Sequence, residues 1–226
     1  MSDRISAADF QAADGTDDWR VTADERATAV FRTGSFTTGV QLVEAIGELA
    51  EAANHHPDVD LRYGTVTVRL TSHDVGGLSE RDEALAVQVS QAARELDVTA
   101  DPAAPTGITV GIDVLDGRAV QPFWRAVLGY QETTGGDADD AAPALVDPSG
   151  ALPTVWFQQM DAPREQRNRI HLDVYVGPGV AEQRVADAVA AGGRIVTDEF
   201  APAWWVLADA EGNEACVCTW QEAAER

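Results

Sequence analysis

Residues 51–82 read EAANHHPDVDLRYGTVTVRLTSHDVGGLSERD and hold three of the four histidines in the chain. His55 and His56 are adjacent, and Pro57 after them disfavours helical geometry at the preceding residue. His73 lies at the far end of an alternating run, and imidazole is the side chain best suited to moving protons near neutral pH. The stretch therefore predicts a helix end with two imidazoles, followed by a strand that carries a third.

The helix that leads to the histidine pair is expected from Phe36 to about Asn54, because apolar residues recur there at helical spacing. The pair then sits at a helix C-terminus, where a protonated imidazole is favoured. The buried stripe of this helix is expected to comprise Phe36, Val40, Val43, Ile46 and Ala50.

A single strand is expected over Leu61–His73, with alternate residues facing the core and His73 on the polar face. Ser79, with Asp82 three residues later, predicts the capped start of a second helix. The buried stripe of that helix is expected to be Leu85, Val89, Ala92 and Leu96.

The segment before the first long helix predicts a short helix over Ser6–Ala13 and two short strands, Trp19–Val21 and Ala29–Arg32. The order strand, strand, helix, strand, helix is typical of a small α+β domain whose antiparallel sheet carries its helices on one face. We expect this domain to span residues 1–98.

These pieces together resemble the pterin-4a-carbinolamine dehydratase family, in the HHP after an amphipathic helix, the strand ending in TSH and the following GLSERD. The resemblance covers roughly Trp19–Ala93. It implies a lyase that dehydrates 4a-hydroxytetrahydrobiopterin to quinonoid dihydropterin without a metal or organic cofactor, with His55, His56 and His73 as its catalytic residues. Flanking residues are implied as substrate contacts: Glu51, Asn54, Pro57, Asp58, Thr71 and Ser72.

The implied reaction expels a hydroxyl group from C4a and removes a proton from a ring nitrogen, so it needs an acid and a base. We assign this work to His55 and His73, and orientation of the hydroxyl to His56. The chain departs from the family pattern at Asn54, where an acidic residue is common, and at Val59, where an aromatic is common. Both departures concern contacts with the substrate.

Without the resemblance, the three histidines allow other roles. An adjacent pair near a helix end can be a solvated cap, and a histidine on a strand can be structural. A zinc site is a further alternative, although adjacent side chains rarely reach one ion and no cysteine lies nearby. Two other functions also stay open: a pterin-binding or regulatory module without turnover, and a main activity in the second half of the chain.

Residues 99–106, TADPAAPT, are expected to be a short linker, because small residues and prolines interrupt any periodicity. Residues 107–226 then contain an internal repeat at an offset of 62 residues, with first strands around Ile108 and Ile170. Each copy reads as strand, helix and three further strands, which indicates paired copies of one supersecondary unit. The helices are expected at Arg118–Leu128 and Gly179–Ala191.

The duplicated unit resembles the vicinal oxygen chelate, or glyoxalase-like, superfamily in the phrases FWRAVLGY, NRIHLDVYV and DAEGNEACV. The resemblance implies metal ligands on the first and last strands of each copy, at positions occupied here by Thr109, Thr154, His171 and Cys216. Threonines are poor ligands for a borderline metal, so we expect no metal centre. The same four residues and Trp156 are candidates for a pocket that takes a planar or apolar ligand. Further lining is expected from Gln158, Trp204, Trp205 and Cys218, unless the tryptophans are core residues.

Acidic residues outnumber basic ones by 38 to 16 in this chain of 226 residues, for a formal net charge of −22. Such a charge repels nucleic acid and anionic membrane surfaces. Neither a signal peptide nor a membrane-spanning run is visible, and Cys216 and Cys218 lie too close along one strand for a disulfide. We therefore expect a cytoplasmic protein that binds small molecules and forms the homo-oligomer that the dehydratase resemblance implies.

Overall fold

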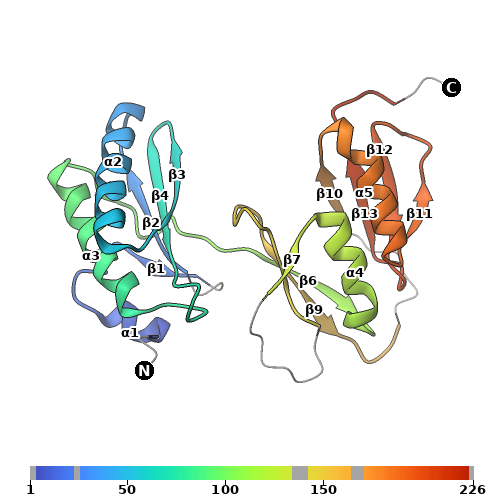
Figure 1. Cartoon of the computed structure of the whole chain (residues 1–226), viewed down its shortest axis with the longest axis horizontal. Helices are drawn as coiled ribbons and strands as arrows, with labels where there is room; N and C mark the ends of the chain where they lie inside the picture. The colour runs from blue at the N-terminus through green and yellow to red at the C-terminus, as the bar shows by residue number, and fades with distance from the viewer. Residues whose placement is uncertain (1–3, 23–25, 134–141, 164–170, 224–226) are drawn as a thin grey trace. The chain divides into compact units, whose positions relative to one another are not determined.

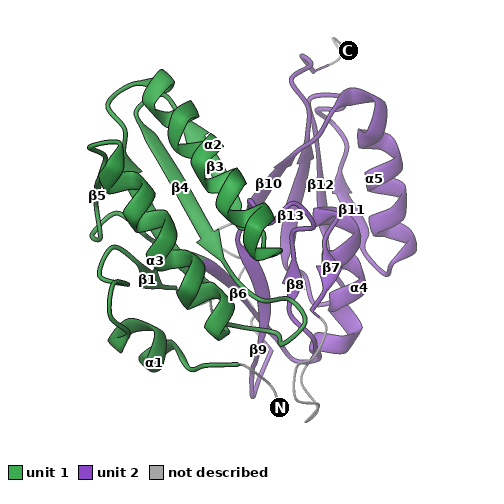
Figure 2. Cartoon of the chain, turned by 60° about the vertical axis from the view of Figure 1, so that its left-hand side comes forward, with its two compact units in different colours: residues 1–108 green, residues 109–226 purple. Residues whose placement is uncertain are grey.

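The computed structural model describes residues 4–22, 26–133, 142–163 and 171–223. The chain divides into two compact units, residues 1–108 and residues 109–226 (Figures 1 and 2). Within the described ranges, no helix is both long and apolar enough to cross a membrane.

The first unit is an antiparallel sheet with two long helices against one face (Figure 2). The strands run in the order β1-β2-β4-β3, and β5 also pairs with β2. In chain order the elements are α1 (Ala7–Ala12), β1 (Arg20–Val21), β2 (Ala27–Arg32), α2 (Phe36–Ala53), β3 (Asp58–Arg62), β4 (Thr65–Leu70), α3 (Glu80–Glu95) and β5 (Thr99–Ala100). The α+β architecture predicted from the sequence is confirmed.

The core of this unit lies between the sheet and the helices. Burying an aliphatic or aromatic side chain there contributes roughly 1.5–3 kcal/mol, so these contacts are the main favourable term. Trp19 extends the core, since its ring meets Phe31 edge-on and its indole N–H donates to Ser90 Oγ at 3.0 Å. The largest contributors from the sheet and the long helices are Phe31, Val66, Val68, Leu70, Leu42, Ile46, Leu85 and Val89.

The prediction of a single strand over Leu61–His73 is wrong. Residues 58–70 instead form a hairpin, in which β3 and β4 pair antiparallel around a two-residue turn at 63–64. The apolar positions change phase at this turn, from Leu61 and Tyr63 before it to Val66, Val68 and Leu70 after it, and the single-strand prediction overlooked that change. β4 ends at Leu70, and His73 therefore lies beyond the strand, exposed in the turn that follows.

The face that α2 buries also differs from the predicted stripe. Phe36 is 50% exposed and Val40 is 45% exposed. A Cβ atom at Gly39 would collide with the side chain of Leu61, so this glycine allows the helix to pack closely on β3. The prediction holds for Ile46 and Ala50 and is wrong for the first two turns of the helix, because the pattern of apolar side chains does not register the glycine. The residues that α2 buries are Gly39, Leu42, Ile46 and Ala50.

The segment expected to be a linker begins as part of the first unit. Thr99 and Ala100 form β5 and pair with the end of β2. Asp101 continues the attachment, because its N–H donates to the carbonyl of Val30 at 2.8 Å and its carboxylate accepts from Arg32 at 2.6 Å. The ordered sheet therefore extends past residue 98.

The second unit consists of two βαβββ repeats, as predicted, and each repeat forms its own four-stranded sheet (Figure 1). The first repeat comprises β6 (Thr109–Val114), α4 (Gly117–Leu128), β7 (Gln131–Glu132), β8 (Leu145–Val146) and β9 (Thr154–Gln159). The second comprises β10 (Leu172–Tyr175), α5 (Pro178–Ala190), β11 (Arg194–Thr197), β12 (Trp204–Ala208) and β13 (Glu214–Cys218). The predicted strand residue Ile170 lies outside the described residues.

One hydrophobic core joins the two repeats, with side chains from α4, α5 and both sheets. The indole N–H of Trp124 in α4 donates to Asp209 of the second repeat at 3.0 Å, and Asp209 is fully buried. Glu211 accepts from two backbone N–H groups just before α4, at 2.7 Å each. Trp205 belongs to this core, which is the alternative to a pocket lining that the sequence left open.

The two repeats differ in the register of their parallel strand pairs. In the first repeat, Thr109 of β6 lies opposite Thr154 of β9. Exact repetition would set His171 opposite Cys216, but Cys216 of β13 lies opposite Asp173 of β10. The second pair is therefore shifted by two residues, which keeps each side chain on its face while changing its partner.

Candidate active site

The position of His55 is set by the way α2 ends. Asn54 adopts the left-handed conformation, with φ of 48° and ψ of 41°, and asparagine tolerates this region better than most residues. The N–H groups of Asn54 and His55 both return to the carbonyl of Ala50, which closes the helix in a Schellman-type cap. The chain therefore turns sharply, and the His55 side chain enters the protein instead of continuing along the helix surface.

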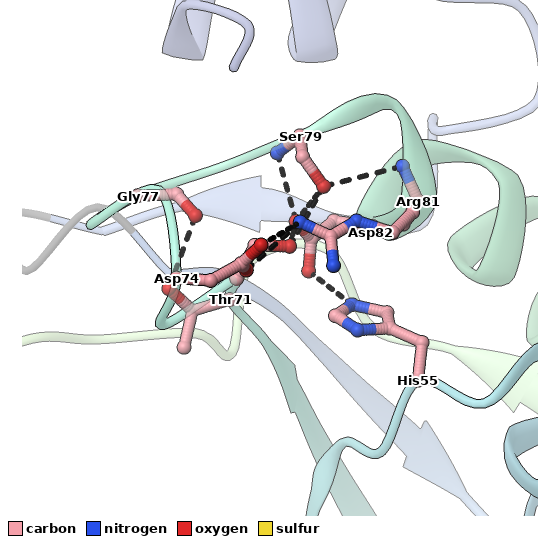
Figure 3. A network of polar contacts seen from close by, with 8 residues as sticks. His55, Thr71, Asp74, Gly77, Ser79, Arg81 and Asp82 are labelled. Atoms are coloured by element: carbon pink, nitrogen blue, oxygen red, sulfur yellow. Dashed lines mark hydrogen bonds and ion pairs between the residues drawn. The ribbon is translucent and has the colours of Figure 1, made fainter. Parts of the chain in front are cut away.

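Asp82 receives the His55 side chain. His55 Nε2 lies 2.7 Å from Asp82 Oδ1, and both residues are buried (Figure 3). The second carboxylate oxygen accepts from the N–H of Ser79 at 2.8 Å, from its hydroxyl at 3.0 Å and from the hydroxyl of Ser72 at 2.8 Å. One carboxylate therefore caps α3 and fixes an imidazole that comes from the end of α2.

The turn between β4 and α3 carries His73. Ser72 anchors it, since its N–H donates to the carbonyl of Gly77 at 2.8 Å and its hydroxyl reaches Asp82. His73 is the next residue and is exposed. The network thus connects the base of this turn to His55, and among the described residues no hydrogen bond ties down the His73 ring.

Two charged groups close the outer side of this turn (Figure 3). Arg81 donates to both carboxylate oxygens of Asp74, at 2.9 and 3.0 Å. These hydrogen bonds hold the pKa of Asp74 below its usual value, the charge of Arg81 adds to the lowering, and a protonated His55 would add a smaller one. The surroundings of His55 therefore include a second, exposed carboxylate besides Asp82.

His56 is exposed at the surface, whereas the neighbouring His55 is buried. Its Nε2 lies 3.2 Å from Glu51 Oε1, and both side chains are exposed. Asp58 lies 3.6 Å from Arg26, and Pro57 is half-buried. Glu51, Pro57 and Asp58 lie beside the histidine pair, and their role as substrate contacts stays a prediction.

Three of the other expected substrate contacts take part in hydrogen bonds or a helix cap within the first unit. Ser72 is buried and its hydroxyl is engaged by Ser79 and Asp82, so it positions the network and does not face solvent. Thr71 bonds weakly, at 3.4 Å, to the carbonyl of Gly77, and Asn54 forms the helix cap. The sequence identified Asp82 as a helix cap but gave no sign that His55 would meet it.

In the second unit, the five candidate residues fall into two groups. Thr109 and Thr154 are paired across β6 and β9, and the ring of Trp156 lies against Gly111 of the same sheet. His171 and Cys216 belong to the second repeat, where Asp173 joins them. Burial raises the pKa of the Cys216 thiol to about 12, and a hydrogen bond to Asp173 makes a smaller contribution in the same direction.

The superfamily's two-repeat ligand pattern can be tested on these residues. Its two first-repeat positions offer only threonine hydroxyls, so residues from both repeats do not form a good metal-binding set. Asp173 was missed because it became a neighbour of Cys216 only through the register shift.

Comparison with known proteins finds a separate family match for each of the two units. Residues 3–92 match the family described as pterin 4 alpha carbinolamine dehydratase, and residues 109–218 match the glyoxalase-like domain family. A Chloroflexus aggregans protein named "Putative pterin-4-alpha-carbinolamine dehydratase" is 42% identical over 74 residues, which are 33% of this chain and 79% of that protein. A Roseiflexus protein of the same name is 36% identical over 91 residues, 40% of this chain and 98% of its own. A solved glyoxalase/bleomycin resistance protein/dioxygenase family enzyme from Burkholderia phytofirmans is 19% identical with a TM-score of 0.42, and the match covers 50% of this chain and 97% of that one.

Proposed function

Because the chain belongs to the pterin-4a-carbinolamine dehydratase family through residues 3–92 and carries a glyoxalase-like domain at residues 109–218, we propose that its first unit dehydrates a 4a-hydroxytetrahydropterin. The reaction breaks the bond between C4a and the hydroxyl oxygen, and the hydroxyl leaves as water with a proton from an acid. A base takes the proton of the adjacent ring nitrogen, and a carbon–nitrogen double bond forms to give the quinonoid dihydropterin. The elimination needs no metal or organic cofactor.

The buried His55–Asp82 pair is the observation that carries this proposal. The Asp82 oxygens accept hydrogen bonds from Ser72, Ser79 and His55, so the carboxylate requires a proton on His55 Nε2. In a neutral imidazole this leaves Nδ1 as the nitrogen with a free lone pair. An orienting carboxylate of this kind supports His55 as the base that takes the ring-nitrogen proton.

The other two histidines are suited to different tasks. His73 is exposed on a turn that Ser72 anchors to the same network, which supports it as the acid for the departing hydroxyl. His56 shares a contact with Glu51 at the surface, which supports a role in orienting the hydroxyl or assisting proton transfer. Glu51, Asn54, Pro57, Asp58 and Thr71 remain candidates for the edge of the pterin site.

The test is steady-state dehydration of a 4a-hydroxytetrahydropterin generated in the assay, corrected for the uncatalysed rate. His55→Gln and His73→Ala are each expected to lower turnover by roughly 100-fold or more, the usual scale for a positioned acid or base. His171→Ala is the matched control, because this exposed histidine lies in the second unit. Near-native turnover in both first-unit variants would contradict the assignment. A wild-type protein that binds the pterin product tightly but shows no turnover would favour the binding-module alternative.

The remaining features of the proposal concern assembly and the second unit. We expect self-association through the first unit, to be measured by size-exclusion chromatography with light scattering. We also expect the second unit to bind a small molecule, since Trp156 is 40% exposed and lies against Gly111 on a sheet face. A planar or apolar ligand suits such a surface.

A further inference from the structure

Three potential metal-binding side chains gather on the sheet of the second repeat. They are His171 immediately before β10, Asp173 in β10 and Cys216 in β13. Their donor atoms all lie within 4.8 Å of one another, and His171 Nε2 is 3.3 Å from Asp173 Oδ1. This cluster is separate from the histidine network of the first unit.

The strand register explains why these three residues meet. β10 and β13 are parallel neighbours, and Asp173 lies directly opposite Cys216. Leu172 and the β13 residues on either side of Cys216 pack on the core, so alternation places the three donors on the opposite face of the sheet. His171 precedes Asp173 by two residues and therefore shares its face.

The donors are an imidazole nitrogen, a carboxylate oxygen and a sulfur atom, which are the ligand types that zinc prefers. Cys216 is buried, whereas the side chains of His171 and Asp173 are 50% and 47% exposed. An ion held by them would have a protein side and a side open to an added ligand, the arrangement typical of sites with three protein ligands.

We propose that the second repeat alone binds one borderline divalent transition-metal ion, such as Zn²⁺, through His171, Asp173 and Cys216. This set of three ligands differs from the superfamily's pattern, in which both repeats supply ligands. The first-repeat positions of that pattern are occupied here by Thr109 and Thr154. The three-ligand set also replaces our sequence-based expectation of no metal centre, which did not include Asp173.

Metal binding requires only small rearrangements of the existing contacts. Without the ion, Asp173 pairs with His171 and accepts a hydrogen bond from the Cys216 thiol. The ion takes the place of the thiol proton, which passes to solvent as the thiolate becomes a ligand. Bonds of about 2.0–2.3 Å to a tetrahedral ion bring the donors to about 3.5 Å from one another. The two exposed side chains can make this movement while Cys216 stays in place.

Cobalt provides the test, because the absorption spectrum of Co²⁺ reports its ligands. Tag-free full chain, freed of metal with a chelator, is titrated with Co²⁺ and then with Zn²⁺. We expect saturation at one ion per chain, thiolate-to-cobalt charge-transfer absorption in the near ultraviolet and visible bands of tetrahedral intensity. Zn²⁺ should then displace the cobalt and remove both signals.

Variants identify the ligands. Asp173→Asn and His171→Gln are expected to keep the fold and weaken Co²⁺ binding at least about tenfold. Cys216→Ser should abolish the charge-transfer absorption. Cys218→Ser on the same strand and Thr109→Val in the first repeat are the matched controls, and both should retain one bound ion and the charge-transfer signal. Circular dichroism of each variant reports its fold.

Several results would overturn this inference. They are a wild-type chain without the charge-transfer signal at one equivalent of Co²⁺, a signal that survives Cys216→Ser, and a signal lost in either control variant. If Cys216→Ser does not fold, the two exposed positions decide, since unchanged affinity in Asp173→Asn or in His171→Gln contradicts the three-ligand set. The readout is spectroscopic and is independent of dehydratase turnover.

Discussion

Asp82 is the residue on which both the start of α3 and the orientation of His55 depend. In Asp82→Asn, the amide NH₂ group would face at least one donor of the present network, so part of the hydrogen bonding is lost. We expect the free energy of unfolding to fall by roughly 1–3 kcal/mol. Turnover should fall at least about tenfold, because the tautomer of His55 is no longer fixed. Denaturant unfolding and kcat measured on the folded variant test both effects.

Asp74→Asn is the matched control for that experiment. Asp74 also lies close to His55 but is exposed and paired with Arg81 at the surface. Exposed ion pairs contribute about 0–1 kcal/mol, so we expect stability to stay nearly unchanged and turnover to stay within a few-fold of the wild type. If Asp74→Asn lowered turnover as much as Asp82→Asn does, the negative charge near His55 would matter more than the orientation of His55 by Asp82.

Substitutions of Asn54 distinguish a role in capping α2 from a role in binding the substrate. Its left-handed backbone costs an ordinary L-residue about 1–2 kcal/mol, whereas glycine adopts it freely. We expect Asn54→Ala to destabilise the protein by about 1 kcal/mol, and Asn54→Gly to leave stability within about 0.5 kcal/mol of the wild type. If the side chain serves only as a cap, Asn54→Gly keeps full turnover. A large rise in KM for this variant would restore Asn54 to the substrate site.

At the level of elements, the sequence predicted types and order better than boundaries and faces. The start of α3 at Ser79 and the helices of both repeats follow from caps and periodicity, which are local signals. The β3–β4 hairpin is a local feature that the single-strand prediction overlooked. The close packing at Gly39 depends on Leu61, which is distant in sequence, so no local pattern contains it.

The same distinction applies to the candidate sites. The three histidines are visible in the sequence because their motif is compact. Asp82 meets His55 because the end of α2 lies beside the start of α3. Asp173 lies opposite Cys216 because of the two-residue register shift. Both relations exist only after the chain has folded.

The role of β5 as an element leads to a prediction about fragments. A fragment of residues 1–98 lacks β5 and the attachment of Asp101 to Val30 and Arg32, whereas residues 1–106 retain them. We expect the longer fragment to be more stable by roughly 1–3 kcal/mol, because two or three hydrogen bonds of the sheet edge are kept. It should also keep dehydratase turnover if it assembles as the full chain does. A folded and correctly assembled 1–106 fragment without turnover would mean that the second unit completes the site.

At the scale of the whole molecule, the two units have separate hydrophobic cores. The residues that form the first core all lie before residue 101, and those of the second all lie after residue 109. Since a cooperative folding unit is defined by its shared core, we expect the chain to unfold in two independent transitions.

Substitutions in each core test this independence. Leu85 and Leu207 are buried leucines of the first and second core, and replacing either with alanine should cost about 2–5 kcal/mol. For units of about 100 residues this corresponds to a fall of roughly 10 °C or more in the midpoint of the affected transition. In calorimetry, Leu85→Ala should shift one transition and Leu207→Ala the other, while the remaining transition keeps its midpoint. If either substitution moves both transitions together, the units stabilise each other, and the proposed division of labour between them would be contradicted.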